Sequence, residues 1–390
     1  LTPPSWTNED QNFSKFTKTV YWLETFNNHS LEQVVRIAWN KNPSLLAMAE
    51  HSLVRGEEAV IAGAEIVPSV NLGVNGSRSK RNLIGFNFPN GSTSFTSQSF
   101  NSGFNLSWEI DLWGKIRNRK ESAKKRFAEA QADFEGARLS LAGRVSKAWY
   151  GIVESNQQLK LSAQMTETFK KNQNFIANRF ANGLASSLEN NLATTALASS
   201  QASETKLQRR RDNLVRDLEA ILDNYPDGSM DVNFSNSLPL LDLTPMPPTP
   251  AKVLENRHDL KAARLQLEAT GHDLSVARSS LLPTFSLSGI SGSRSEEFGE
   301  LLDNRFRTWE VTGSVTQPIF NAGRLRANIR RTKAIRQAAR ANYHAIALRA
   351  LTEVESLLAN EYFLSTEESY LSIASETAQA AAQSSWDRYR

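Results

Sequence analysis

The 390-residue chain contains no cysteine. Zinc fingers, disulfide frameworks and thiol catalysis are therefore excluded, and the absence is compatible with an oxidising envelope compartment. No apolar run approaches 18 residues, which excludes a transmembrane helix, although the strands of a membrane-spanning barrel give a much weaker signal. An excess of one charge is also missing, because 45 Lys and Arg stand against 41 Asp and Glu, for a net charge of +4. Nucleic acid is thus not an expected partner.

Histidine is scarce and scattered, with no metal-ligand spacing and no nucleophile motif. The five histidines are His29, His51, His258, His272 and His344. We therefore expect no enzyme, no bound metal and no cofactor. The chain begins at Leu1 rather than Met and shows no basic-then-apolar leader, so we expect a mature or trimmed form.

One pattern of residues occurs twice in the chain. The first copy runs from Leu45 through Pro68, an alternating polar and apolar segment, Gly114 and a long charged stretch. The second runs from Leu260 through Pro283, a similar segment, Gly323 and another long charged stretch, at an offset that changes only in a loop. Such a duplication indicates one supersecondary unit used twice.

This duplication predicts a mainly α-helical fold with a small β part, built from a repeated helix-strand-strand-helix unit. We expect an extended N-terminal arm over 1–28, a first repeat over 29–225, a Pro-rich linker over 226–250 and a second repeat over 251–390. The expected strands span about 69–79, 97–112, 284–294 and 309–320, and the expected long, coiled-coil helices span about 114–181, 186–224 and 323–390. Shorter helices are expected over 31–39 with Ser30 as N-cap, from 43 to about 67, and over 250–282. The second repeat ends where the first makes its turn, so we expect it to lack its last helix.

The strands alternate apolar and polar residues. Leu106, Trp108 and Ile110 share one predicted face, with Ser107 and Glu109 on the other. Four strands cannot close a spanning barrel, so a lipid-facing sheet would require several chains to pool their strands. A small soluble sheet with one face on a core is the alternative. The attachment of these strands to very long helices favours the pooled arrangement.

Four segments of the chain resemble the TolC-type outer-membrane factors of bacterial efflux systems. The run from Leu106 to Lys115 looks like the family's strand-to-helix junction, and Gln317 to Gly323 looks like its second copy. Arg179 to Ser186 matches the family's helical turn, and the segment around Trp22-Leu23 and Asn42-Pro43 is similar to the start of the lipoprotein branch paired with resistance-nodulation-division pumps. That branch carries an acylated N-terminal cysteine, which this chain lacks.

The resemblance implies an architecture and partners. Three chains would form one tube, with a 12-stranded β-barrel in the outer membrane and a long α-helical barrel across the periplasm. The tube would be a passive exit duct, energised by an inner-membrane pump and joined to it by a periplasmic adaptor protein. The implied partners are therefore a homotrimer, the adaptor, the pump and outer-membrane lipid.

The same resemblance assigns candidate site residues at the periplasmic end. The docking tip for the adaptor would comprise Arg179, Phe180, Asn182, Gly183, Leu184 and Ser186, with Arg388 and Tyr389 at the equivalent place in the second repeat. An ordinary helical hairpin turn is the alternative. Glu189 lies where the family often has an acid near the channel entrance, and a solvated helix residue is the alternative there. In relatives the constricting acids lie past the position of Arg390, so no gate residue is predicted.

Aromatic and basic residues near the junctions are candidates for the membrane interface. Trp108, Trp113 and Trp309 would form interfacial girdles, with plain packing as the alternative. A basic cluster follows each junction: Lys115, Arg117, Arg119, Lys120, Lys124, Lys125 and Arg126, then Arg324, Arg326, Arg330, Arg331, Lys333, Arg336 and Arg340. Positive charge at a helix start opposes the macrodipole. We therefore expect several of these residues, among them Lys115, Arg117, Arg324 and Arg326, to face anionic lipid headgroups or carboxylates on adjacent helices.

The function that these observations favour is a channel subunit that exports drugs or other small toxic molecules, and so confers multidrug resistance. A duct for protein secretion is the alternative within the family. A soluble coiled-coil scaffold is the alternative from a different class.

Overall fold

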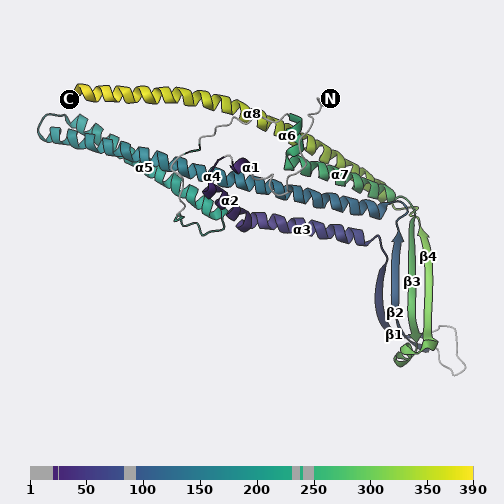
Figure 1. The fold of residues 1–390 in the computed structure, drawn as a ribbon. Coiled ribbons are helices and arrows are strands. Elements are labelled where there is room, and N and C mark those ends of the chain that lie inside the picture. The colour runs from purple at the N-terminus through teal and green to yellow at the C-terminus, as the bar shows by residue number, and fades with distance from the viewer. Residues whose placement is uncertain (1–20, 25, 83–93, 231–237, 240–249, 390) are drawn as a thin grey trace. The chain divides into compact units, whose positions relative to one another are not determined.

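The computed structural model describes residues 21–24, 26–82, 94–230, 238–239 and 250–389. Helices dominate these residues, and the strands form one sheet (Figure 1). The helices are α1 (Tyr21–Glu24), α2 (His29–Lys41), α3 (Pro43–Ala64), α4 (Lys115–Ala181), α5 (Ser187–Ile221), α6 (Pro250–Asn256), α7 (His258–Ser279) and α8 (Arg324–Tyr389). The strands are β1 (Ser69–Asn82), β2 (Ser94–Ile110), β3 (Thr284–Ser295) and β4 (Arg307–Thr316), with short 3₁₀ helices at Phe298–Leu302 and Asn304–Phe306.

The chain divides into two compact units that are interleaved along the sequence. The first comprises Leu1–His51 and Gln131–Lys252, and the second comprises Ser52–Ala130 and Val253–Arg390. This division differs from the two sequence repeats, because α3 and α4 each contribute residues to both units. The repeat boundaries at 29–225 and 251–390 stay a prediction about internal duplication.

The core of the first unit lies among α2, α4 and α5. On α4, Val145, Trp149 and Ile152 recur at three- and four-residue spacing and are fully buried, as expected for the apolar stripe of an amphipathic helix. The same cluster includes Leu31, Val35, Ala38, Val215 and Leu218. Replacing Trp149 with Ala would remove about 3–5 kcal/mol of stability at such a site.

Asn42 fixes the ends of three helices in the first unit. Its backbone N–H donates to the carbonyl of Ala38 at the end of α2, and its Oδ1 accepts from the N–H of Leu45 at the start of α3. Its Nδ2 also donates to the carbonyl of Ile221, the last residue of α5, at 2.9 Å. One buried amide therefore satisfies terminal groups that would otherwise lack partners.

The second unit contains the sheet, in the order β1-β2-β3-β4, with every neighbouring pair antiparallel. α7 leads into β3 and packs along α8, where Ala269, Leu274 and Ala339 are buried (Figure 1). Gly114 and Gly323, one at each strand-to-helix junction, have φ angles of +71° and +81°. This left-handed conformation favours glycine and lets each chain turn from strand into helix.

Several expected elements differ from those in the structure. The helix expected over 250–282 is interrupted at Arg257, which has an extended backbone (ψ 128°) and binds Asp259 and Glu353 through its guanidinium. β4 ends at Thr316 rather than near 320, since Pro318 cannot donate a ladder hydrogen bond. The N-cap of α2 is Asn28, whose side chain accepts from Leu31, and not Ser30.

The expected arm over 1–28 and linker over 226–250 fall largely outside the described residues. Within the arm, Tyr21–Glu24 forms one helical turn instead of an extended segment. Across the described helices, none has a stretch that is both long and apolar enough to cross a membrane.

Candidate functional site

The sheet of the second unit carries a continuous apolar face. The register pairs Leu72 with Phe104, Trp108 with Leu287 and Phe285 with Val315, so directly opposed apolar residues lie on the same side of all four strands. The residues of this face, called the apolar sheet face below, are Val70, Leu72, Val74, Phe104, Leu106, Trp108, Ile110, Phe285, Leu287, Trp309, Val311 and Val315. Most of the large side chains are exposed, and Trp309 reaches 80%. An apolar surface of this size marks a contact with lipid or protein.

The opposite face of the sheet is polar, except for Phe95 and Ile290. It presents Asn71, Asn75, Asn101, Asn105, Ser107, Glu109, Ser286, Ser288, Glu310, Thr312 and Ser314. The two edge strands, β1 and β4, each have only one partner strand among the described residues. Their outer edges therefore present unpaired backbone N–H and C=O groups, which form a template for strand addition.

Three glycines lie in register across the polar face. Gly73 pairs with Gly103, which pairs in turn with Gly292. A Cβ on Gly292 would lie 2.0 Å from the carbonyl oxygen of Ser102, and one on Gly103 would lie 2.9 Å from that of Ser291. β2 and β3 can approach this closely only because neither position carries a side chain.

The three predicted interfacial tryptophans have different environments. The indole Nε1 of Trp108 donates to the carbonyl of Ile66 at 2.9 Å, and that of Trp113 donates to the carbonyl of Pro283 at 2.7 Å. Trp309 lies on the apolar sheet face and is the most exposed of the three. Amphipathic rings with one anchored N–H suit a boundary between apolar and wet surroundings. The interfacial role of all three remains a prediction.

Six of the seven residues of the first basic cluster, all but Lys120, form ion pairs within the second unit. Lys115 pairs with Glu109 at 2.8 Å and Arg117 pairs with Asp111 at 3.3 Å. Further ion pairs join Arg119 to Glu65, Lys124 to Glu121, Lys125 to Glu268 and Arg126 to Asp273. Carboxylates of the protein, on neighbouring elements for all of these residues except Lys124, supply the counter-charge that was expected from either lipid or protein.

Asp111 caps the start of α4. Its carboxylate accepts from the backbone N–H groups of Ile116 and Arg117 at 3.0 and 2.9 Å. Partial burial acts to raise the pKa of Asp111, but these backbone bonds and the guanidinium of Arg117 outweigh it, so the pKa lies below its ordinary value. A negative charge held at the helix N-terminus also offsets the basic residues of the first turns.

The second basic cluster has no such compensation. Arg324, Arg326 and the five further basic residues up to Arg340 are all exposed on α8. Among the residues that the structure describes, none of the seven forms an ion pair. The two junctions are therefore similar in sequence, but the basic residues after the first are mostly paired with carboxylates and those after the second are not.

The predicted docking tip is the turn between α4 and α5, in the first unit. Leu184 N–H donates to the carbonyl of Arg179 at 2.8 Å, and Gly183 N–H donates to that of Phe180 at 2.9 Å. With Gly183 at φ +72°, these bonds form a Schellman motif. Asn182 Nδ2 binds the carbonyl of Asn178, and Arg179 binds that of Leu184. The turn is thus held by both backbone and side-chain hydrogen bonds.

Glu189 is part of a capping box at the start of α5. Its carboxylate accepts from the backbone N–H and the hydroxyl of Ser186, and the Ser186 hydroxyl accepts from the N–H of Glu189. The backbone and side-chain bonds from Ser186 lower the pKa of Glu189. Its predicted role near the channel entrance is untested. Arg388 and Tyr389 lie in the last turn of α8.

An apolar stripe next to the tip was missed by the sequence analysis. Leu188 and Leu192 follow Leu184 at four-residue spacing, and all three are more than 60% exposed. Phe180 is also 44% exposed on the preceding helix. The four-residue period was visible in the sequence, but only the hairpin geometry shows that these leucines have no covering layer.

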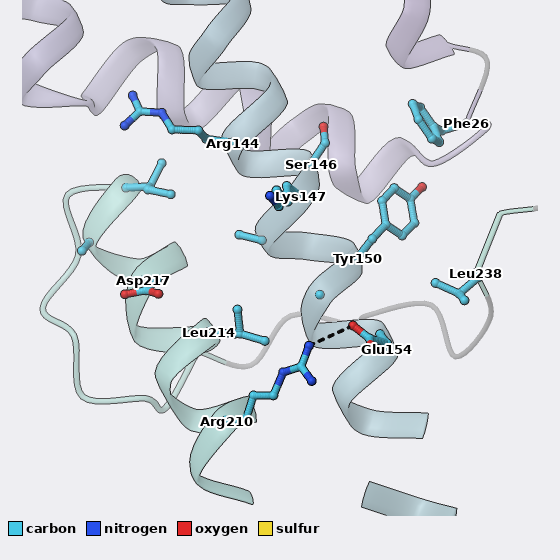
Figure 2. A pocket seen from close by; sticks show the side chains of 14 residues that line it. Phe26, Arg144, Ser146, Lys147, Tyr150, Glu154, Arg210, Leu214, Asp217 and Leu238 are labelled. Carbon is cyan, nitrogen blue, oxygen red and sulfur yellow. Dashed lines mark hydrogen bonds and ion pairs between the residues drawn. The ribbon is translucent and has the colours of Figure 1, made fainter. Parts of the chain in front are cut away.

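A hollow of about 910 Å³ lies beside α4 and α5 in the first unit. Figure 2 shows Arg144, Lys147 and Tyr150 on α4 and Arg210 and Asp217 on α5 around it, with Arg210 paired to Glu154 at 3.4 Å. Charges of both signs line the hollow, so it selects no ligand of one sign. No cluster of metal-ligating side chains occurs in the described ranges.

The comparisons with known proteins agree with this geometry. The model of the outer membrane efflux protein family matches residues 34–224 and 249–390. The pyoverdine export outer membrane protein OpmQ of Pseudomonas putida is 25% identical over the whole chain and 82% of its own length. Outer membrane protein OprJ of Pseudomonas aeruginosa is 26% identical over 95% of this chain and 77% of its own.

Solved structures give the same result. A membrane protein from Pseudomonas aeruginosa superposes with a TM-score of 0.88 at 25% identity, over 99% of this chain and 89% of that one. The CmeC outer membrane channel of Campylobacter jejuni shares the fold, with a TM-score of 0.76 over 90% of this chain and 77% of its own. The chain therefore belongs to the outer membrane efflux protein family and is a subunit of an outer-membrane efflux channel.

Proposed function

We propose that three copies of this chain form one channel, with the sheets pooled into a 12-stranded barrel in the outer membrane and the long helices in the periplasm. The observation that carries this proposal is the apolar sheet face, which has exposed side chains on β1, β2 and β4 and half-buried ones on β3, and which is bounded by two open edges. Eight strands are the usual minimum for a spanning barrel, and joining β4 of one copy to β1 of the next removes every edge.

The polar face of the sheet would then line the lumen. Asparagine, serine and threonine suit a water-filled interior, whereas valine, leucine and tryptophan suit lipid. β1 has 14 residues and β2 has 17, so both exceed the 9–11 residues that a tilted strand needs to span a bilayer. β3, with 12 residues, and β4, with 10, are close to that spanning length, so all four strands are long enough for the membrane and only β1 and β2 leave several residues for a rim.

The turn from Arg179 to Ser186 would dock to a periplasmic adaptor protein that joins the channel to an inner-membrane pump of the resistance-nodulation-division type. Support comes from a hydrogen-bonded, capped turn next to an exposed apolar stripe, since well-placed apolar side chains are what a protein partner binds. Leu184, Leu188 and Phe180 would be the anchors, with Arg179 and Asn182 around them.

The cargo would be small organic molecules, drugs among them. The names of relatives include pyoverdine export, antibiotic efflux and toluene efflux proteins. One fold thus occurs with chemically different cargoes, and charges of both signs line the hollow beside α4 and α5. We propose that the duct is passive and that selection lies with the pump and adaptor.

Two variants on one strand test the orientation of the sheet. Val311→Arg places a charge on the apolar sheet face, and Thr312→Arg places the same charge on the polar face. Arginine at the lipid midplane costs about 2–4 kcal/mol, whereas a lumen position tolerates charge. In mild detergent, light scattering should show elongated trimers for the parent and for Thr312→Arg. In liposomes, these two proteins should insert and Val311→Arg should not. Equal insertion of both variants, or a compact monomer that ignores detergent, would overturn the proposal.

A further inference from the structure

The outer surface of α8, just after the second junction, is strongly basic and has no partner in the chain. Like charges at three- and four-residue spacing on a helix destabilise it, and the seven exposed cations lie within five turns. An anionic partner is therefore favoured. Lipid headgroups form a layer only about 5–8 Å thick on each side of the hydrocarbon, so they reach the first turn and not the later ones.

The basic residues on α8 flank a row of exposed alanines. Ala327, Ala334 and Ala341 recur at seven-residue spacing and lie away from the face that packs on α7, where Thr332 and Ala339 are buried. Arg330 follows Ala327 on one side of the row and Arg331 lies on the other. Such a row with flanking charges has the pattern of a coiled-coil seam.

The exposed face of α3 has the complementary character. Val54 and Ile61 are seven residues apart and are 53% and 66% exposed. Glu57 and Glu58 lie on either side of this pair along the helix. Glu57 has no ion pair within the described residues, and Glu58 has only the exposed contact to Arg55 on its own helix, at 2.7 Å. The exposed face of α3 has large apolar and acidic side chains, whereas that of α8 has alanines and basic side chains. The two faces are therefore complementary in side-chain size and in charge.

The path of the chain brings these faces together between copies. α3 leads into β1 and α8 leaves β4, and these are the two open edges of the sheet. When β4 of one copy pairs with β1 of a second copy, the antiparallel strands place α8 beside α3 of that second copy, in opposite directions.

The distances along the chain, counted from Pro68 for α3 and from Gly323 for α8, also agree. Ile61 precedes Pro68 by about 10 Å of helix, and the hole formed by Ala327, Arg330, Arg331 and Ala334 is centred about 11 Å after Gly323, at 1.5 Å per residue. Val54 lies about 21 Å before Pro68, and the next hole, formed by Ala334, Gln337, Ala338 and Ala341, is centred about 22 Å after Gly323.

We propose that Val54 and Ile61 of α3 insert as knobs into these two holes on α8 of a second copy, with Glu57 and Glu58 paired to Arg330 and Arg331. This inference rests on the proposed trimer. It assigns the helix–helix contact that fixes how far α8 of one copy is shifted along α3 of the next. It also accounts for the absence of internal counter-charges at the second junction.

Charge exchange tests the ion pairs. Arg330→Glu with Arg331→Glu, or Glu57→Arg with Glu58→Arg, should raise the concentration at which trimers half-dissociate in mild detergent by about tenfold. All four changes together should restore the parent value. Arg336→Glu with Arg340→Glu makes the same charge change on another face of α8 and should leave trimers unaffected. A double reversal that behaves like the parent, or a fourfold variant without recovery, would overturn this inference while the parent trimer still upholds the proposed function.

Cross-linking tests the register directly, since the chain has no native cysteine. Ile61→Cys with Ala334→Cys should give disulfide-linked copies on mild oxidation. Ile61→Cys with Ala345→Cys should not, because the second position lies about 16 Å further along α8. The reverse outcome would refute the register. A parent protein that is monomeric in detergent would instead refute the trimer itself.

Discussion

The indole Nε1 of Trp113 donates a hydrogen bond of 2.7 Å to the carbonyl oxygen of Pro283. Trp113 ends the first strand-to-helix junction, and Pro283 precedes β3 of the second repeat. The contact therefore ties the strand-to-helix junction of the first repeat to the helix-to-strand junction of the second, within the second unit. The hydroxyl of Ser279 also donates to the carbonyl of Trp113, at 3.4 Å.

Trp113→Phe removes this donor but keeps an aromatic ring beside Phe285, 6.3 Å away in the parent. We expect a loss of about 0.5–1.5 kcal/mol, the net value of one hydrogen bond. Thermal unfolding in mild detergent would measure it. Trp309→Phe is the matched control, because Trp309 is 80% exposed, and its change should stay below about 0.5 kcal/mol. Equal losses in both variants would show that the bond to Pro283 contributes nothing.

Gly292→Ala should distort the sheet, because the added Cβ would lie 2.0 Å from the carbonyl oxygen of Ser102. Overpacking of this kind costs about 1–3 kcal/mol. Gly289, on the same strand, has only ordinary contacts at 3.7 and 3.8 Å, so Gly289→Ala should be close to neutral. The unfolding midpoints of the two variants would test this. A lower midpoint for Gly292→Ala alone would indicate the close approach of β2 and β3, whereas a lower midpoint for both would indicate that β3 tolerates no added side chain.

Gly183→Ala should destabilise the docking tip by roughly 1–2 kcal/mol, since φ is +72° and an L-residue resists that conformation. Gly143→Ala should have the opposite sign, because Gly143 lies inside α4 with open space around it and alanine is the better helix former. Hydrogen exchange at Leu184 would locate the effect. Unchanged protection there in Gly183→Ala would contradict the assigned turn.

The cap formed by Asp111 should make stability depend on pH. The folded-state pKa is lowered, so this contribution is present above the ordinary carboxyl pKa of 3.8 and is lost as the pH falls through the lower folded value. Asp111→Ala should cost about 0.5–2 kcal/mol at pH 7. The gap between parent and variant should close in acid, below about pH 4. A gap that stays constant down to pH 2 would show that ionisation of Asp111 is not responsible.

Local signals in the sequence predicted much of the fold. Apolar alternation placed Leu106, Trp108 and Ile110 on one face of their strand, and the register of the sheet confirms that they share it. The lack of proline between Gly114 and Ala181 indicated a long helix, and α4 spans 67 residues. In both cases the signal lies in neighbouring residues along one element.

Features that depend on distant partners could not be predicted. The ion pairs of Lys125 with Glu268 and of Arg126 with Asp273 join residues far apart in the sequence. The sequence of the two basic clusters therefore did not indicate that the first would be paired with carboxylates and the second would not. The break at Arg257 has the same origin, because its guanidinium binds Glu353 on α8 at 2.6 Å.

The two open edges of the sheet also constrain how such a channel can be made. A single copy displays valine, leucine and tryptophan to water on one face and free strand edges on both sides, which are features that promote aggregation. Newly exported chains must therefore be shielded in transit, and release from that shielding has to coincide with meeting other copies and the bilayer.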